Sequence, residues 1–285
     1  MKKKANLQPV RKKIIDRLCS AGAVKPGEAV MPMAQLCTAF CEAPDELAKL
    51  PIAQARLKTA IPRLVRAFLE FDTDTTRALA GEARIGSAMV DLNELRVTPA
   101  IELAAILGAR YPFADSRCSM LHRTLQSIYD RENQMTLVSL ASMKKTEIRN
   151  YLRTLAGITP YVEATVALEC FEVAACPVDT KLLLWLISKG ALEQECTVPE
   201  AQQILEKEIV AKKLPAFYKG SRKELEDWTP KTWPAVAKVP SPILAPPAIA
   251  PPAGAQMPIR EPVRTKTGAK PKPITVKKPA AVKKG

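Results

Sequence analysis

Short apolar repeats at helical spacing, each closed by a start or stop signal, constrain the fold of this chain more than any other feature. Between residues 98 and 209, apolar side chains recur every three or four positions, as they do on one face of a helix. Thr98 and Pro99 form a start signal and Gly108 a stop, while Thr197 and Glu200 have the spacing of a capping box. Because no stretch alternates as a half-buried strand would, the sequence predicts an all-α fold.

Periodicity and composition divide the chain into five segments. In the first hundred residues, only the second half has the periodic pattern. The last fifty-odd residues are rich in Pro, Ala and Lys and have no apolar stripe. We therefore predict a basic N-terminal arm (1–27), an uncertain helical extension (28–56), a helical domain (57–212), a linker (213–230) and a disordered basic tail (231–285).

Positive charge is concentrated at the two ends. The chain has a net charge of +14, of which residues 231–285 carry +10 and residues 2–13 carry +6, so the body between them is close to neutral. A flexible Lys-rich tail suits the phosphate backbone of nucleic acid, which it binds without reading sequence. The last four lysines, Lys277, Lys278, Lys283 and Lys284, are therefore candidate DNA contacts, although a solubilising tail or a membrane or ribosome contact fits the same composition.

Several classes of protein do not fit the sequence. The start of the chain lacks the apolar stretch of a signal peptide, and the longest apolar run, residues 182–187, is too short to cross a bilayer. The seven scattered cysteines predict reduced thiols, and Cys37 and Cys41 lack further ligands for a zinc site. We expect a cytoplasmic protein without a metal or other cofactor. His122, the single histidine, lies in an apolar helical stripe and is interpreted as structural.

Residues 152–166 predict a helix, a tight turn and a second helix. Gly157 permits the turn, and Thr159 with Pro160 begins the second helix. Such a hairpin leaves backbone N–H groups around Gly157, Ile158 and Thr159 to hold a phosphate, assisted by the helix dipole.

Asp179 follows the hairpin and precedes an apolar helix. The sequence Val178-Asp179-Thr180 lies 22 residues after Gly157. An aspartate at a helix start can place negative charge against a developing positive charge in an enclosed pocket, or can simply cap the helix. Both interpretations stay open at this point.

Together, the hairpin and Asp179 resemble the endonuclease III-like superfamily of helix-hairpin-helix DNA glycosylases (HhH-GPD), over roughly residues 91–208. The resemblance implies that Gly157 is the first hairpin glycine, that Thr159 replaces the second, and that Asp179 is catalytic. Tyr161 occupies the position of the lyase lysine, which implies a monofunctional enzyme. Only Cys196 follows Asp179, so the iron–sulfur cluster of many members is not expected.

The resemblance implies a DNA-binding base-excision repair protein. We expect a monomer, associated with the nucleoid, that binds double-stranded DNA through Gly157, Ile158, Thr159 and Tyr161 and hydrolyses the bond between a damaged or mismatched base and deoxyribose. The alternative is a non-catalytic helix-hairpin-helix protein that keeps the fold and binds DNA.

Overall fold

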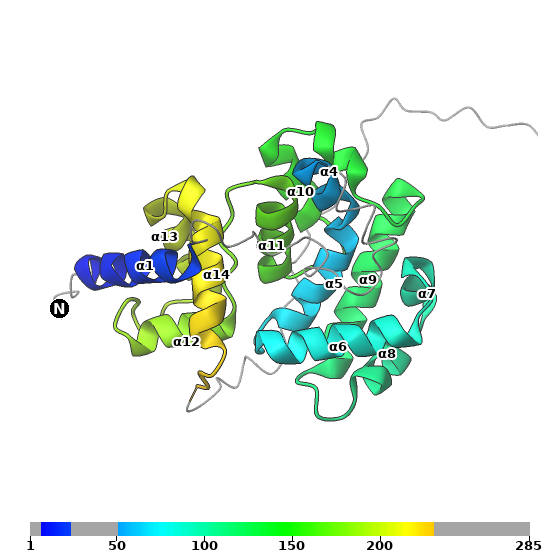
Figure 1. Cartoon of the computed structure of the whole chain (residues 1–285), viewed down its shortest axis with the longest axis horizontal. Coiled ribbons are helices and arrows are strands. Elements are labelled where there is room, and N and C mark those ends of the chain that lie inside the picture. The colour runs from blue at the N-terminus through cyan, green and yellow to red at the C-terminus, as the bar shows by residue number, and fades with distance from the viewer. Residues whose placement is uncertain (1–6, 24–50, 231–285) are drawn as a thin grey trace, which may run out of the picture. The chain divides into compact units, whose positions relative to one another are not determined.

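The computed structural model describes residues 7–23 and 51–230, and this part of the chain contains helices and no strand (Figure 1). The predicted all-α class is therefore confirmed for these residues. The α-helices are α1 (Gln8–Gly22), α4 (Ile52–Lys58), α5 (Ala60–Glu70), α6 (Thr75–Ala88), α7 (Leu92–Val97), α8 (Ala100–Leu107), α9 (Ala114–Glu132), α10 (Lys145–Arg153), α11 (Pro160–Phe171), α12 (Thr180–Ser188), α13 (Val198–Glu208) and α14 (Leu214–Leu225). Two 3₁₀ turns, Val138–Ser142 and Ala211–Lys213, join neighbouring helices. None of the described helices is long and apolar enough to span a membrane.

The helix boundaries follow the local signals. Helix α8 begins after Thr98 and Pro99 and ends at Gly108, whose φ is +87°. The capping box at Thr197 and Glu200 is present at the start of α13. These boundaries are set by side chains within one turn of the helix end, which is why the sequence predicted them.

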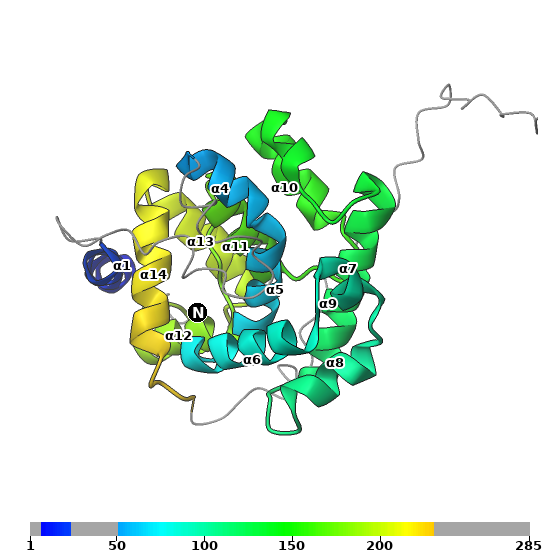
Figure 2. The same cartoon turned by 45° about the vertical axis from the view of Figure 1, so that its right-hand side comes forward.

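Helix α5 is the central element of the described residues. Every residue of α5 is buried, and the helix contacts α6, α9 and α11 (Figures 1 and 2). Two of its buried arginines meet carboxylates: Arg63 lies 2.9 Å from Glu70, and Arg66 lies 2.5 Å from Glu82. A buried charge is tolerated when it is paired in this way.

The predicted linker at residues 213–230 is wrong, because it contains helix α14. Phe217 and Tyr218 of α14 are buried, and the helix packs against α1. The two helices cross at glycines: a Cβ on Gly22 would lie 1.9 Å from the carbonyl oxygen of Ala216. Contact this close between two backbones requires glycine.

The predicted basic arm also differs from the structure over residues 8–22, which form α1. The apolar side of α1 is buried and consists of Ile15, Leu18 and Cys19. Arg11 pairs with Glu208 on α13 through hydrogen bonds of 2.8 and 2.5 Å. Helix α1 was not predicted because its partners lie nearly two hundred residues away. The proposed disordered tail and the Cys37 and Cys41 pair lie outside the described residues.

Candidate functional site

The loop between α10 and α11 is the hairpin that the sequence predicted. Gly157 has a φ of +85°, and a Cβ at this position would lie 2.6 Å from the carbonyl oxygen of Met120 on α9. The hydroxyl of Thr124, also on α9, donates to the carbonyl oxygen of Ala156 at 3.0 Å. The turn is therefore held firmly against α9, and only glycine fits at its centre.

The hairpin leaves some of its backbone donors without a partner among the described residues. Thr159 caps α11 by accepting from the amide of Val162 at 3.3 Å, so one of the free donors at this helix start is already used. The amides of Gly157 and Thr159 make no hydrogen bond with any other described residue. Gly157, Ile158 and Thr159 are nevertheless buried, and Ala156 is the exposed residue of the turn. A phosphate would approach the loop at Ala156.

An exposed arginine lies beside this turn. The Cβ of Arg123 on α9 is 3.1 Å from the position that a Cβ on Gly157 would occupy, and the residue is exposed. Arg131, two turns further along α9, donates to the carbonyl oxygen of Thr154 at 2.5 Å and so closes the end of α10. Two arginines of α9 thus lie next to the hairpin, Arg123 near Gly157 and Arg131 at Thr154.

Asp179 lies at the start of α12 and is 5% exposed. Its Oδ1 accepts from the amide of Leu182 at 2.8 Å, which is the N-cap contact, and its Oδ2 accepts from the amide of Asp72 at 3.0 Å. Nη1 of Arg222 lies 3.5 Å from the same Oδ2. The carboxylate is therefore fixed in position from three sides.

The sequence analysis missed the second carboxylate of this site, Asp72. It lies between α5 and α6 with a φ of +53°, and its Oδ1 accepts from the amide of Lys181 at 3.1 Å. The side chain of Asp179 therefore binds the backbone of Asp72, which is 107 positions earlier in the sequence. The side chain of Asp72 in turn binds the backbone two residues after Asp179. Burial, followed by the nearby charge of Asp179, raises the pKa of Asp72 to about 7. A carboxyl group that keeps its proton near neutral pH can act as an acid.

Arg117 on α9 fixes the turn that carries Asp72. The arginine is fully buried, donates to the carbonyl oxygen of Phe68, and donates to that of Phe71 at 3.0 Å. Its guanidinium also lies 3.9 Å from the centre of the Phe71 ring. Because these carbonyls end α5, Arg117 holds the helix terminus and the following Asp72 in one geometry.

Tyr161 is buried below the hairpin and does not reach its surface. Its hydroxyl lies 2.9 Å from that of Tyr218 on α14, and Tyr218 donates to Glu70 at 3.1 Å. Burial raises the pKa of Tyr161, so the phenol stays protonated. Of the predicted site residues, the structure therefore joins Asp179 and Tyr161 through neighbours on α14, whereas Lys277, Lys278, Lys283 and Lys284 lie outside the described residues.

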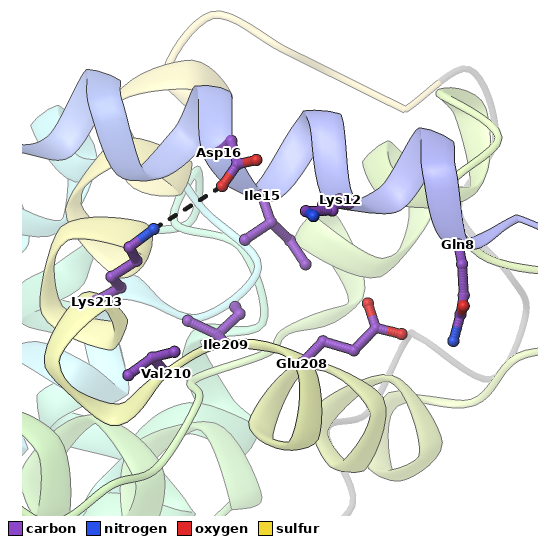
Figure 3. Close-up of a pocket in the computed structure, with 8 residues that line it drawn as sticks. All are labelled: Gln8, Lys12, Ile15, Asp16, Glu208, Ile209, Val210 and Lys213. Atoms are coloured by element: carbon purple, nitrogen blue, oxygen red, sulfur yellow. Dashed lines mark ion pairs between the residues drawn. The ribbon is translucent and has the colours of Figure 1, made fainter.

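A separate hollow lies along α1 (Figure 3). It has a volume of about 360 Å³ and is lined by Ile15 and Lys12 of α1 and by Ile209 and Val210 after α13. Its mixed lining includes one ion pair, between Asp16 and Lys213 at 4.0 Å. This hollow does not include the hairpin or Asp179 among its lining residues.

Comparison with known proteins adds one similarity of fold. No protein-family model matches the sequence, and no curated protein is similar to it. Among solved structures, the chain is similar to a trapped endonuclease III–DNA covalent intermediate, an estranged-adenine complex. The identity is 15% and the TM-score 0.49, over 78% of this chain and 90% of that one. At this level the similarity assigns neither an activity nor a partner to this chain.

Proposed function

We propose that this chain is a DNA-binding protein of base-excision repair that hydrolyses the N-glycosidic bond of a nucleotide taken out of the duplex. The observation that carries the proposal is the pair of buried carboxylates: Asp179 accepts from the amide of Asp72, and Asp72 accepts from the amide of Lys181 at the start of α12. Two neighbouring carboxyl groups, one charged and one protonated, are the pair that most enzymes use to hydrolyse a glycosidic bond.

In this proposal Asp179 supplies the negative charge. As the base departs, positive charge develops on the sugar, and a fixed carboxylate in a dry site stabilises it. The attacking water gives its oxygen to the sugar C1′ and its proton to Asp179. Because Asp179 is only 5% exposed, the nucleotide must displace side chains that cover it, which matches the need to extrude a base before reaction.

Asp72 is the proposed acid. Its pKa of about 7 leaves much of it protonated near neutral pH, so it can give a proton to the departing base as the glycosidic bond breaks. The base leaves neutral, and both carboxyl groups recover their protonation states by exchange with solvent. No amine takes part, because the hairpin position that would hold a lysine is Tyr161.

DNA binding in this proposal combines the hairpin with the basic ends. The amides at Gly157 and Thr159 and the charge of Arg123 would hold one phosphate, and the lysines of residues 231–285 would add affinity without sequence preference. A monomer associated with the nucleoid in the cytoplasm fits this mode of binding.

One observation favours a second candidate, a DNA-binding protein without the activity. Asp179 is already held by Leu182, Asp72 and Arg222, as a purely structural cap would be. In that case the fold and the hairpin would serve binding alone.

Base release from defined duplexes separates the two candidates. The full chain is incubated with duplexes that bear uracil, oxidised guanine, alkylated adenine, or G·T and A·G mismatches. We expect base release from one of these, with a loss of about 100-fold or more in Asp179→Asn, which keeps the helix cap but loses the charge. The matched control is Asp74→Asn, because Asp74 caps α6 by accepting from Arg77 at 2.7 Å.

The control variant should retain full activity. If the wild-type chain binds every duplex and releases nothing, the second candidate is correct. If Asp179→Asn releases the base as fast as Asp74→Asn, the chain is an enzyme but the role proposed for Asp179 is wrong.

A further inference from the structure

Helix α14 reaches both residues that the sequence motif singled out. Tyr218 bonds to Tyr161 at 2.9 Å, and Arg222, one turn later, lies 3.5 Å from Asp179. Side chains four residues apart share one face of a helix, so this face of α14 forms a wall of the site. The sequence had assigned these residues to a linker.

Arg222 acts on Asp179 mainly through its charge. Its side chain is 11% exposed, and Nη2 donates to the carbonyl oxygen of Thr73 at 2.9 Å. Nε and Nη1 are buried and make no hydrogen bond with the described residues. Burial works against its charge, but the carboxylates of Glu70 and Asp179 oppose this effect and the pKa of Arg222 is raised, so the guanidinium stays positive.

The two carboxyl groups differ in what faces them. Asp179 accepts two backbone hydrogen bonds and has Arg222 beside it. Asp72 accepts from the amide of Lys181 and forms no ion pair with a described residue. Arg117 is near Asp72, but its guanidinium is directed to carbonyl oxygens of α5 and its turn.

We propose that Arg222 assigns the charge within the pair, holding Asp179 as the charged member and leaving the proton on Asp72. The catalytic role of this charge assignment rests on the proposed function, in which the two carboxyl groups have different roles. Arg222 is then a positioning residue. Through it, helix α14 sets which carboxyl group is the acid and which is the charged group. Among the other groups facing the pair, Tyr161 is neutral and Lys181 has its pKa lowered, first by burial and then by Arg222.

Carbon-13 NMR of the aspartate carboxyl groups tests this directly in the full chain. Asp72→Asn and Asp179→Asn assign the two signals. In the wild type, the Asp72 signal should move in one full step as pH rises through about 7. In Arg222→Gln, the Asp72 signal should no longer show one full step at that midpoint, because the proton is then shared within the pair and is lost in two macroscopic steps.

Two further variants control for charge and for helix position. Arg222→Lys keeps the positive charge and should keep the wild-type pattern. Lys219→Met changes an exposed residue of the same helix and should also leave it unchanged. If the Asp72 signal in Arg222→Gln keeps the wild-type midpoint and the full wild-type change, the proposal is overturned.

A second measurement does not depend on the folding of an Arg222 variant. With Arg222 in place, Asp179→Asn should lower the titration midpoint of Asp72 by about one pH unit or more, since a neighbouring negative charge is removed. An unchanged midpoint would show that Asp179 carries no charge and would overturn the assignment. Because the signals are read without DNA, an absence of base release would contradict the proposed function and leave this result standing.

Discussion

Replacing Asp72 with Asn should change how the stability of the protein depends on pH. Burial and the charge of Asp179 raise the pKa of Asp72 from 3.8 to about 7 in the folded state. Asn is well suited to a φ of +53° and can still accept from the amide of Lys181. The variant therefore removes the ionisable group with little change in geometry.

The sign follows from where the proton binds more tightly. Below pH 3.8 Asp72 is protonated in both states and has no effect on the free energy of unfolding. Between pH 3.8 and about 7 the unfolded chain loses this proton while the folded chain keeps it, so the wild type loses stability as pH rises. The full difference is about 4 kcal/mol above pH 7, of which about 2.5 kcal/mol develops between pH 5 and 8.

Urea denaturation at several pH values between 5 and 8 measures this effect. The wild type should lose about 2.5 kcal/mol more than Asp72→Asn across the range. Asp74→Asn, two residues along the same turn, should follow the wild type. Parallel curves for the wild type and Asp72→Asn would refute the assignment of a raised pKa to Asp72.

Three other predictions follow from the hairpin, the tail and Tyr161. Gly157→Ala should cost about 2 kcal/mol or more and weaken DNA binding, because a Cβ would meet the Met120 carbonyl at 2.6 Å. Gly190→Ala, with a similar φ of +69° and nothing within 4 Å, should cost only about 1 kcal/mol in the same urea titration and leave DNA affinity unchanged. Equal losses would show that the φ alone is responsible. Deletion of residues 231–285 should flatten the dependence of DNA affinity on salt, measured by fluorescence anisotropy, since lysine contacts to phosphate are lost. An unchanged slope excludes the tail from binding. The wild type should give no borohydride-trapped adduct with an abasic duplex, because the phenol of Tyr161 cannot form an imine. A strong adduct that survives replacement of Lys144, Lys145 and Lys181 would contradict the alignment of the hairpin.

The sequence by itself determined the local elements of this protein. The start of α8 at Thr98 and Pro99, the capping box at Thr197 and the turn at Gly157 depend on contacts within a few residues. Asp179 was found for the same reason, because an aspartate before an apolar helix is a local signal. Local sequence could not decide whether Asp179 is a helix cap or a catalytic group, since both interpretations place an aspartate at the same position.

Only the tertiary structure brought Asp72 and Arg222 to Asp179. These residues come from three segments separated by more than forty positions, and each alone has an ordinary sequence context. The exposed polar appearance of residues 213–230 suggested a linker, because the apolar face of α14 is completed by α1, and the close crossing at Gly22 has no signature in a single helix. Burial raises the pKa of Asp72 and strengthens the effect of the Arg222 charge on Asp179. Burial depends on which distant helices pack together.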